Sequence, residues 1–156
     1  MWRSAVSFDR SDVGSWLEGP RMPEDSWPGK RLGFPKEGKG SVASFGRRAA
    51  GLVIDWVACL AISALFFHGN QIATLLVFWA EQTLLVGLLG TSLGHRIVGV
   101  RVEPLEGAPT ALARAPFLVR SLVRSTMLAL FIPALVMNTD LRGLNDQAAG
   151  TVVVRR

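Results

Sequence analysis

Residues 49–67, AAGLVIDWVACLAISALFF, decide the fold of this chain together with residues 72–90, IATLLVFWAEQTLLVGLLG. Each stretch makes a helix of roughly 28 Å, about the thickness of the hydrocarbon core of a bilayer. Each carries a single charged residue, Asp55 in the first stretch and Glu81 in the second. Because only the polar residues 68–71 separate the two stretches, the sequence predicts an antiparallel hairpin of membrane-spanning helices.

The arginines around these stretches predict how the hairpin is oriented. Arg47 and Arg48 precede the first stretch, Arg96 and Arg101 follow the second, and residues 49–95 contain no Lys or Arg. Lys and Arg accumulate on the cytoplasmic side of membrane helices. The sequence therefore predicts a multi-pass protein of the plasma membrane with a cytoplasmic N-terminus.

The composition favours the same class of protein. The chain has 156 residues, is 49% hydrophobic and carries a formal net charge of +5. Its basic residues flank apolar stretches instead of forming a folded basic face, so nucleic acid is not an expected partner.

Cys59 is the single cysteine, which excludes an internal disulfide. His68 and His95 lack companions at metal-ligand spacing, and His95 is expected to be a cation beside the membrane. Residues 1–12 lack the apolar run of a cleavable signal peptide.

Residues 1–45 are predicted to be an N-terminal cytoplasmic tail that precedes a membrane domain over residues 46–156. Four prolines and six glycines interrupt any helix in the tail. Trp2, Trp16 and Trp27 could dock on the domain or lie among lipid headgroups, where tryptophan is favoured. A loosely attached tail is the alternative.

Two segments outside the hairpin have the composition of β-strands. Residues 97–102, IVGVRV, are mostly β-branched, and residues 151–154, TVVV, share this character. A turn is expected over residues 104–107. We hypothesise that the two segments pair into a small cytoplasmic β element, which requires the C-terminus to lie on the cytoplasmic side.

A third apolar region, residues 111–138, carries Arg114, Arg120 and Arg124 and is interrupted by Pro133. One interpretation is a third span entered from the cytoplasm, lengthened by arginines that reach the headgroups. The other is an interfacial helix followed by a kinked re-entrant segment. The expected fold is thus an all-α membrane protein, a hairpin plus a third short or kinked segment and a small β element. Its helices are expected at about 47–68, 71–90 and 111–138.

Asp55 and Glu81 are the candidate functional residues of the hairpin. A carboxylate in the hydrocarbon region costs several kcal/mol unless it is paired, hydrated or protonated. The two lie about 14 and 12 residues from the turn, and hence at similar depth. They could share a proton, bind a cation or each pair with an arginine. Arg48 lies on the same helical face as Asp55, and Arg120 or Arg124 is an equally good partner. For both acids, a purely structural role is the alternative.

Three segments occur in a distinctive order: RRAAGLVID at 47–55, GTSLGHRIVGVRV at 90–102 and RGLNDQAAGTVVV at 142–154. Together they resemble the RDD family of small bacterial integral membrane proteins, which is named for one arginine and two aspartates. The resemblance places these residues at Arg48, Asp55 and Asp146, and an arginine common in the family at Arg120. Asn145 departs from the family, which commonly has a histidine there.

The resemblance covers residues 46–156, and WPGKRLGFP at 27–35 is similar to the tail of actinobacterial members. The family has no agreed molecular function, and transport of unidentified ligands and sodium/proton antiport have been suggested for its members. One hypothesis is therefore a transport or ion-translocating component, in which Asp55 and Glu81 bind a cation or proton and the chain oligomerises to enclose a pathway. The alternative is an accessory or assembly subunit of a larger membrane complex, in which the arginine and both aspartates are structural. The sequence identifies no ligand. Because it shows no nucleophile with a base, phosphate loop or dinucleotide motif, neither an enzyme nor a cofactor is expected.

Overall fold

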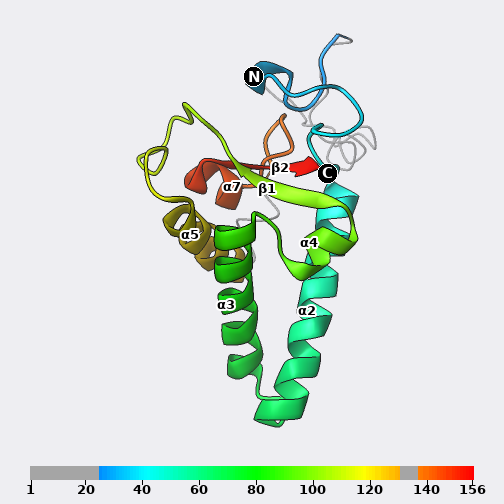
Figure 1. Ribbon diagram of the computed structural model, residues 1–156, viewed down its shortest axis with the longest axis vertical. Helices are drawn as coiled ribbons and strands as arrows, with labels where there is room; N and C mark the ends of the chain where they lie inside the picture. The colour runs from blue at the N-terminus through cyan, green and yellow to red at the C-terminus, as the bar shows by residue number, and fades with distance from the viewer. Residues whose placement is uncertain (1–24, 131–136) are drawn as a thin grey trace, which may run out of the picture.

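The computed structural model describes residues 25–130 and 137–156. Two long helices project from one end of the molecule, and a two-stranded sheet and several shorter helices lie at the other end (Figure 1). In chain order the elements are η1 Lys30–Leu32, α2 Phe45–Phe67, α3 Gln71–Leu89, α4 Leu93–Ile97, β1 Val100–Pro104, α5 Phe117–Ala129, α7 Leu144–Ala149 and β2 Thr151–Arg155.

The two long apolar helices predicted from the sequence are present, and a tight turn joins them. α2 ends at Phe67, and the next two residues, His68 and Gly69, both adopt positive φ angles, of 54° and 72°. Asn70 then caps α3, because its side-chain oxygen accepts hydrogen bonds from the backbone amides of Ile72 at 2.9 Å and Ala73 at 3.1 Å. These bonds satisfy amides that the first turn of a helix leaves without partners.

α2 and α3 leave most of their apolar surface uncovered. Both helices are long and apolar enough to cross a membrane. Only 22% of the most apolar 18-residue stretch of α2, and 28% of that of α3, is buried within the protein. Leu65, Ile72 and Leu88 are 79%, 71% and 70% exposed. The core helix of a soluble domain would bury such residues. The described part of the chain does not supply the apolar environment that these side chains require.

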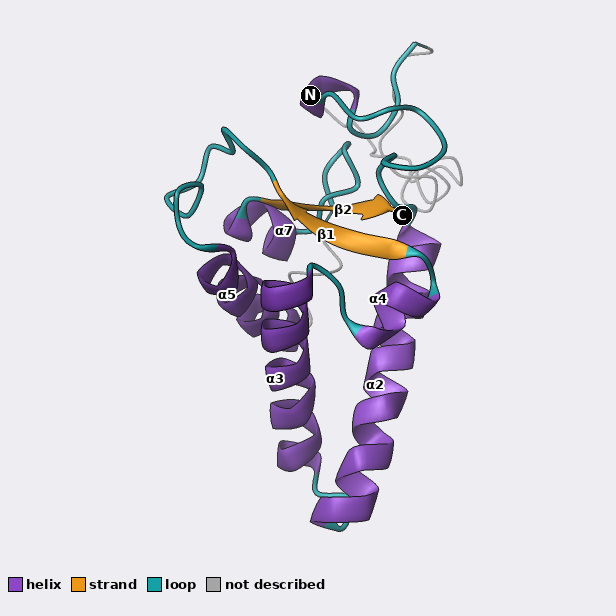
Figure 2. Ribbon diagram, viewed as in Figure 1, coloured by secondary structure: helices purple, strands orange, loops and turns teal. Residues whose placement is uncertain are grey.

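The predicted pairing of the two β segments is confirmed, but the first strand begins at Val100, because Ile97 belongs to α4 and a turn follows it. β1 and β2 form an antiparallel pair in which Val100 lies opposite Arg155 and Val102 lies opposite Val153. The sheet lies across one end of the hairpin (Figure 2). It packs on α3 through a buried apolar cluster that also includes Val86.

The helix predicted over residues 111–138 is shorter than expected at its start. α5 begins at Phe117, and residues 110–115 form turns and a bend. Pro116 explains the boundary, because a proline disfavours helical backbone in the residue before it. The described helix of 13 residues is about 20 Å long, shorter than a membrane span. Pro133 and the predicted kink lie outside the described residues.

Part of the N-terminal segment is attached to the sheet. The Gly40 amide donates to Arg155 O at 2.8 Å, and the Ala43 amide donates to Val153 O at 2.9 Å. Trp27 packs within its own segment, since its Nε1 donates to Phe34 O at 2.9 Å. Residues 40–43 therefore form an additional edge beside β2. Trp2 and Trp16 precede the described residues.

Candidate functional site

Asp146, the second aspartate of the RDD resemblance, is the centre of a buried ion-pair cluster, which we call the Asp146 centre. Asp146 is fully buried in α7. One carboxylate oxygen accepts from the Arg48 guanidinium of α2. The other accepts from Arg124 Nε at 2.8 Å and from the Thr151 hydroxyl at 3.2 Å. One carboxylate thus joins α2, α5 and β2.

The two arginines keep Asp146 ionised. Burial alone would raise the pKa of this carboxyl, because a charge loses its hydration inside a protein. The positive charges of Arg48 and Arg124 outweigh that effect and lower the pKa of Asp146 to about 2. Two guanidinium groups against one carboxylate leave the Asp146 centre with an excess positive charge.

Two further buried arginines hold the carbonyl groups between α7 and β2. Arg120 Nε donates to Ala149 O at 2.9 Å, and its Nη2 donates to Gly150 O. Arg142 Nε donates to Thr151 O at 2.9 Å. A helix leaves its last carbonyls without partners, and these guanidinium groups supply them. Arg120, which the sequence placed among the candidate functional residues, therefore stabilises a chain reversal.

Asp55, the first aspartate of the resemblance, has surroundings of a different kind. Its carboxylate accepts hydrogen bonds from Gln82 Nε2 at 2.7 Å, from the Ser92 hydroxyl at 2.5 Å and from the Gly94 amide. Asp55 is 1% exposed. These bonds fasten α4 against the hairpin. We call Asp55, Glu81, Gln82, Ser92 and Gly94 together the Asp55 centre.

Glu81 reaches the same centre from α3. Gln82 Nε2, which donates to Asp55, also donates to a Glu81 oxygen at 3.2 Å. The second Glu81 oxygen accepts from the Leu93 amide at 3.2 Å. The amide of Gln82 therefore bridges the two acids that the sequence placed at similar depth.

The sequence left open an ion pair between Asp55 and an arginine, and this pair does not form. Arg48 turns to Asp146, and Arg124 does the same. Within residues 25–130 and 137–156, no Lys or Arg forms an ion pair with Asp55. The spacing of seven residues puts Arg48 and Asp55 on one face of α2, but it leaves them about 10 Å apart along the helix.

His95 is not the exposed cation that its position after the hairpin suggested. The side chain is 1% exposed, and its Nδ1 lies beside the Ser92 hydroxyl and 3.4 Å from Asp55 Oδ2. Burial lowers the pKa of His95 and outweighs the opposing effect of its hydrogen bond to Asp55. A neutral imidazole therefore stands between the Asp55 centre and the Asp146 centre.

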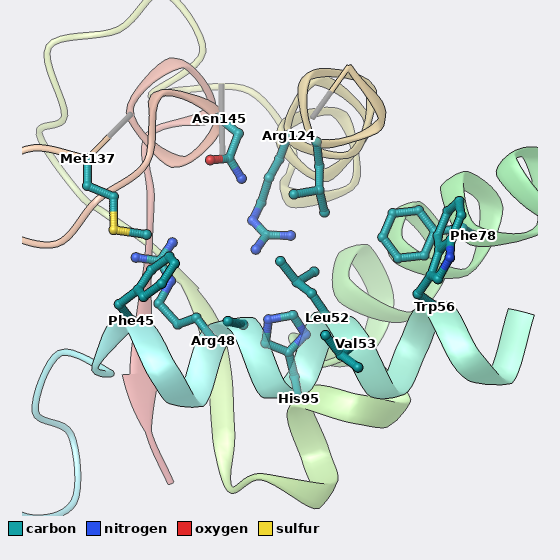
Figure 3. Close-up of a pocket in the computed structure, with 12 residues that line it drawn as sticks. Phe45, Arg48, Leu52, Val53, Trp56, Phe78, His95, Arg124, Met137 and Asn145 are labelled. Carbon is teal, nitrogen blue, oxygen red and sulfur yellow. The ribbon is translucent and has the colours of Figure 1, made fainter. Parts of the chain in front are cut away.

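An apolar pocket lies beside these two centres (Figure 3). It has a volume of about 260 Å³. Its apolar walls come from α2, α3, α5 and Met137, and its polar groups are two guanidinium groups, one imidazole and one amide. The lining residues are Phe45, Arg48, Ala49, Leu52, Val53, Trp56, Phe78, His95, Arg124, Leu128, Met137 and Asn145.

Several residues of the site escaped the sequence analysis. Gln82 was overlooked, although a glutamine directly after Glu81 inside an apolar helix is itself a costly polar group. Ser92 and Arg142 were likewise not among the predicted residues of the site. Within the described ranges, no three His, Cys, Asp or Glu side chains gather closely enough to hold a metal ion.

Comparison of the chain with protein-family models, curated proteins and solved structures found no match in any of the three.

Proposed function

We propose that this protein is an integral membrane protein of the RDD type, with α2 and α3 crossing the plasma membrane as a hairpin. The exposed apolar faces of both helices support this proposal, because lipid would cover them. Arg47, Arg96 and Arg101 flank the end of the hairpin where the sheet lies. By the distribution of positive charge, that end is cytoplasmic.

The proposed task of the protein is ion translocation, as a component of a transport system. The observation that carries this proposal is the bridge from Gln82 Nε2 to both Asp55 and Glu81. Two acids in a medium of low dielectric repel each other strongly when both are ionised. The hydrogen-bond donors to this pair are neutral groups, so a proton or a small cation would relieve the repulsion.

Glu81 is the residue proposed to exchange the ion. Asp55 is 1% exposed and has three hydrogen-bond donors, whereas Glu81 is only half-buried. Asp55 is thus the fixed member of the pair, and Glu81 is the member that an ion can reach. Because two helices cannot enclose a pathway, we propose that copies of the chain associate around it.

Glu81→Gln is expected to reduce coupled flux at least tenfold while leaving the fold intact, because it removes the exchangeable charge but keeps the shape. The measurement uses the full chain in liposomes with an internal pH-sensitive dye and an imposed sodium or potassium gradient. Glu106→Gln, the same change on an exposed loop, is the matched control. Absence of flux with the wild-type protein, or equal flux for wild type and Glu81→Gln, would overturn the proposal.

A second proposal, an accessory or assembly subunit of a larger membrane complex, draws support from the Asp146 centre. Its ion pairs hold the helices and the sheet together, and a structural role explains them without any ligand. The two proposals differ in what accompanies the protein. Purification from native membranes in mild detergent should yield a homo-oligomer if the protein translocates ions by itself. A stoichiometric foreign protein would favour the accessory role.

A further inference from the structure

We propose that the apolar pocket binds a single-chain amphiphile with one acidic headgroup, such as a fatty acid. This site is separate from the Asp55–Glu81 pair, and the proposal does not depend on ion translocation. Three observations carry it: the excess charge at one end of the pocket, an amide side chain that lines the same end, and the apolar character of the opposite end.

The excess positive charge faces the pocket through Arg124. Its Nε is held by Asp146, and its Nη1 is 3.5 Å from the Gln82 side-chain oxygen. Among the described residues, no hydrogen-bond acceptor is found for Nη2. Figure 3 shows the Arg124 guanidinium directed into the pocket, towards His95. Because Asp146 neutralises only one of the two arginines, a ligand with one negative charge would complete the balance of charge.

Asn145 supplies a second polar contact at the same end. The residue is 2% exposed, and Figure 3 shows its amide projecting from α7 into the pocket, near Arg124. Within the described residues, Asn145 Oδ1 has no hydrogen-bond partner. A buried polar atom without a partner costs free energy. An acidic headgroup leaves that cost in place, because Oδ1 and the carboxylate oxygens are all hydrogen-bond acceptors. The headgroup would instead accept a hydrogen bond from Asn145 Nδ2, which Figure 3 shows on the side of the amide towards Arg124.

The other end of the pocket fits an acyl chain. One stripe of α2, at spacings of three and four residues, faces the pocket and ends at Trp56. The Trp56 and Phe78 rings close this end, with their centroids 5.3 Å apart in an edge-to-face arrangement. The pocket volume of about 260 Å³ lies just below the usual range of small-molecule sites, roughly 300–1,000 Å³. One chain suits this space better than the two chains of a phospholipid.

The orientation of the pocket agrees with this ligand. Its polar groups lie near the sheet, at the proposed cytoplasmic end, and Trp56 lies further along α2 towards the turn at His68. An amphiphile taken up from the cytoplasmic leaflet would place its headgroup and its chain in the same order.

The test is a titration of the full chain, held in nanodiscs of phosphatidylcholine, with dodecanoate or with dodecanol. Calorimetry measures the heat in excess of that from empty nanodiscs. We expect dodecanoate to bind one per chain and at least tenfold more tightly than dodecanol, because only the acid makes a charge-assisted hydrogen bond with Arg124. Equal binding of the two compounds would overturn the proposal.

Three variants separate binding in the pocket from general partition into lipid. Ala49→Phe fills the pocket without altering a polar group and should weaken dodecanoate binding at least tenfold. Ala61→Phe, on an exposed face of the same helix, is the control and should bind as the wild type does. Asn145→Leu should weaken dodecanoate binding several-fold. Near-ultraviolet circular dichroism verifies that each variant is folded.

A third titration distinguishes the source of the headgroup. Nanodiscs that contain phosphatidylglycerol present an acidic headgroup on two chains. If the proposal is correct, dodecanoate still binds in them and Ala49→Phe still weakens that binding at least tenfold. If phosphatidylglycerol displaces dodecanoate completely, the pocket belongs to an anionic phospholipid and the single-chain proposal is wrong. Unaltered binding by Ala49→Phe would also refute it.

Discussion

The Asp146 centre and the Asp55 centre each bury one aspartate, but they balance its charge in different ways. Asp146 faces the guanidinium groups of Arg48 and Arg124. Asp55 receives hydrogen bonds from an amide side chain, a hydroxyl and a backbone amide, all of them neutral, and the His95 imidazole 3.4 Å away is neutral as well. The first arrangement keeps the Asp146 carboxylate charged and suits a structural clamp, meaning a group that holds several elements together. The second leaves a negative charge uncompensated next to Glu81 and suits a group that responds to a proton or a cation.

The largest effect that distinguishes the two centres is expected from Asp146→Asn. The amide would leave two buried guanidinium groups without a counter-charge, a loss of about 3–5 kcal/mol in the free energy of unfolding. The yield of folded protein in mild detergent and its thermal unfolding measure this effect. Asp25→Asn, on an exposed residue, should leave both unchanged. A variant as stable as the wild type would show that the ion pairs do not hold the fold together.

A smaller effect is expected from acid, and the lowered pKa of Asp146 determines its sign. The folded protein holds this carboxyl at a pKa of about 2, against an ordinary value of 3.8. The resulting stabilisation is complete above about pH 5 and is lost as the pH falls through 4 towards 2. It amounts to about 2 kcal/mol.

Acid unfolding in detergent, followed by circular dichroism, measures this stabilisation, and Thr151→Val tests its origin. This variant removes one hydrogen bond to Asp146 while keeping the shape of the side chain, so unfolding should begin at a higher pH than in the wild type. Identical acid transitions in the two proteins would assign the acid sensitivity to other carboxyl groups.

The smallest effect on stability is expected from Asp55→Asn. The amide retains an oxygen that accepts hydrogen bonds, and no buried cation is left alone, so the free energy of unfolding should fall by only about 1.5 kcal/mol. Thermal unfolding of Asp55→Asn and of Asp146→Asn in the same detergent gives the comparison directly. A loss as large as that of Asp146→Asn would mean that both centres are clamps and would weaken the proposal of ion exchange.

The sequence was sufficient for the elements that depend on local composition. Two apolar runs predicted α2 and α3, and the β-branched residues of 97–102 and 151–154 predicted a pair of strands that the structure contains. The start of the third helix was misplaced because apolar composition outweighed the effect of Pro116. A proline acts on the backbone before it, which hydropathy does not register.

The site was harder to predict, because its pairings join distant parts of the chain. Arg48 and Asp146 are 98 residues apart, and nothing in their spacing favours this pair over Arg48 and Asp55. The equal depth of Asp55 and Glu81 could be counted from the turn. Gln82 as the bridge between them depends on the direction of side chains, which only three-dimensional packing determines.

The contact between Arg48 and Asp146 also has a consequence for biosynthesis. Arg48 leaves the ribosome nearly a hundred residues before its counter-ion is made. If α2 crosses the membrane as proposed, the guanidinium would stay near water at the edge of this helix during that interval, since an unpaired arginine is costly inside the bilayer. In the proposed topology the hairpin would insert first, and α7, which is synthesised later, would draw the arginine into the core. A nascent chain that stops before α7 presents two unpaired arginines, a mark by which quality-control proteases could recognise it.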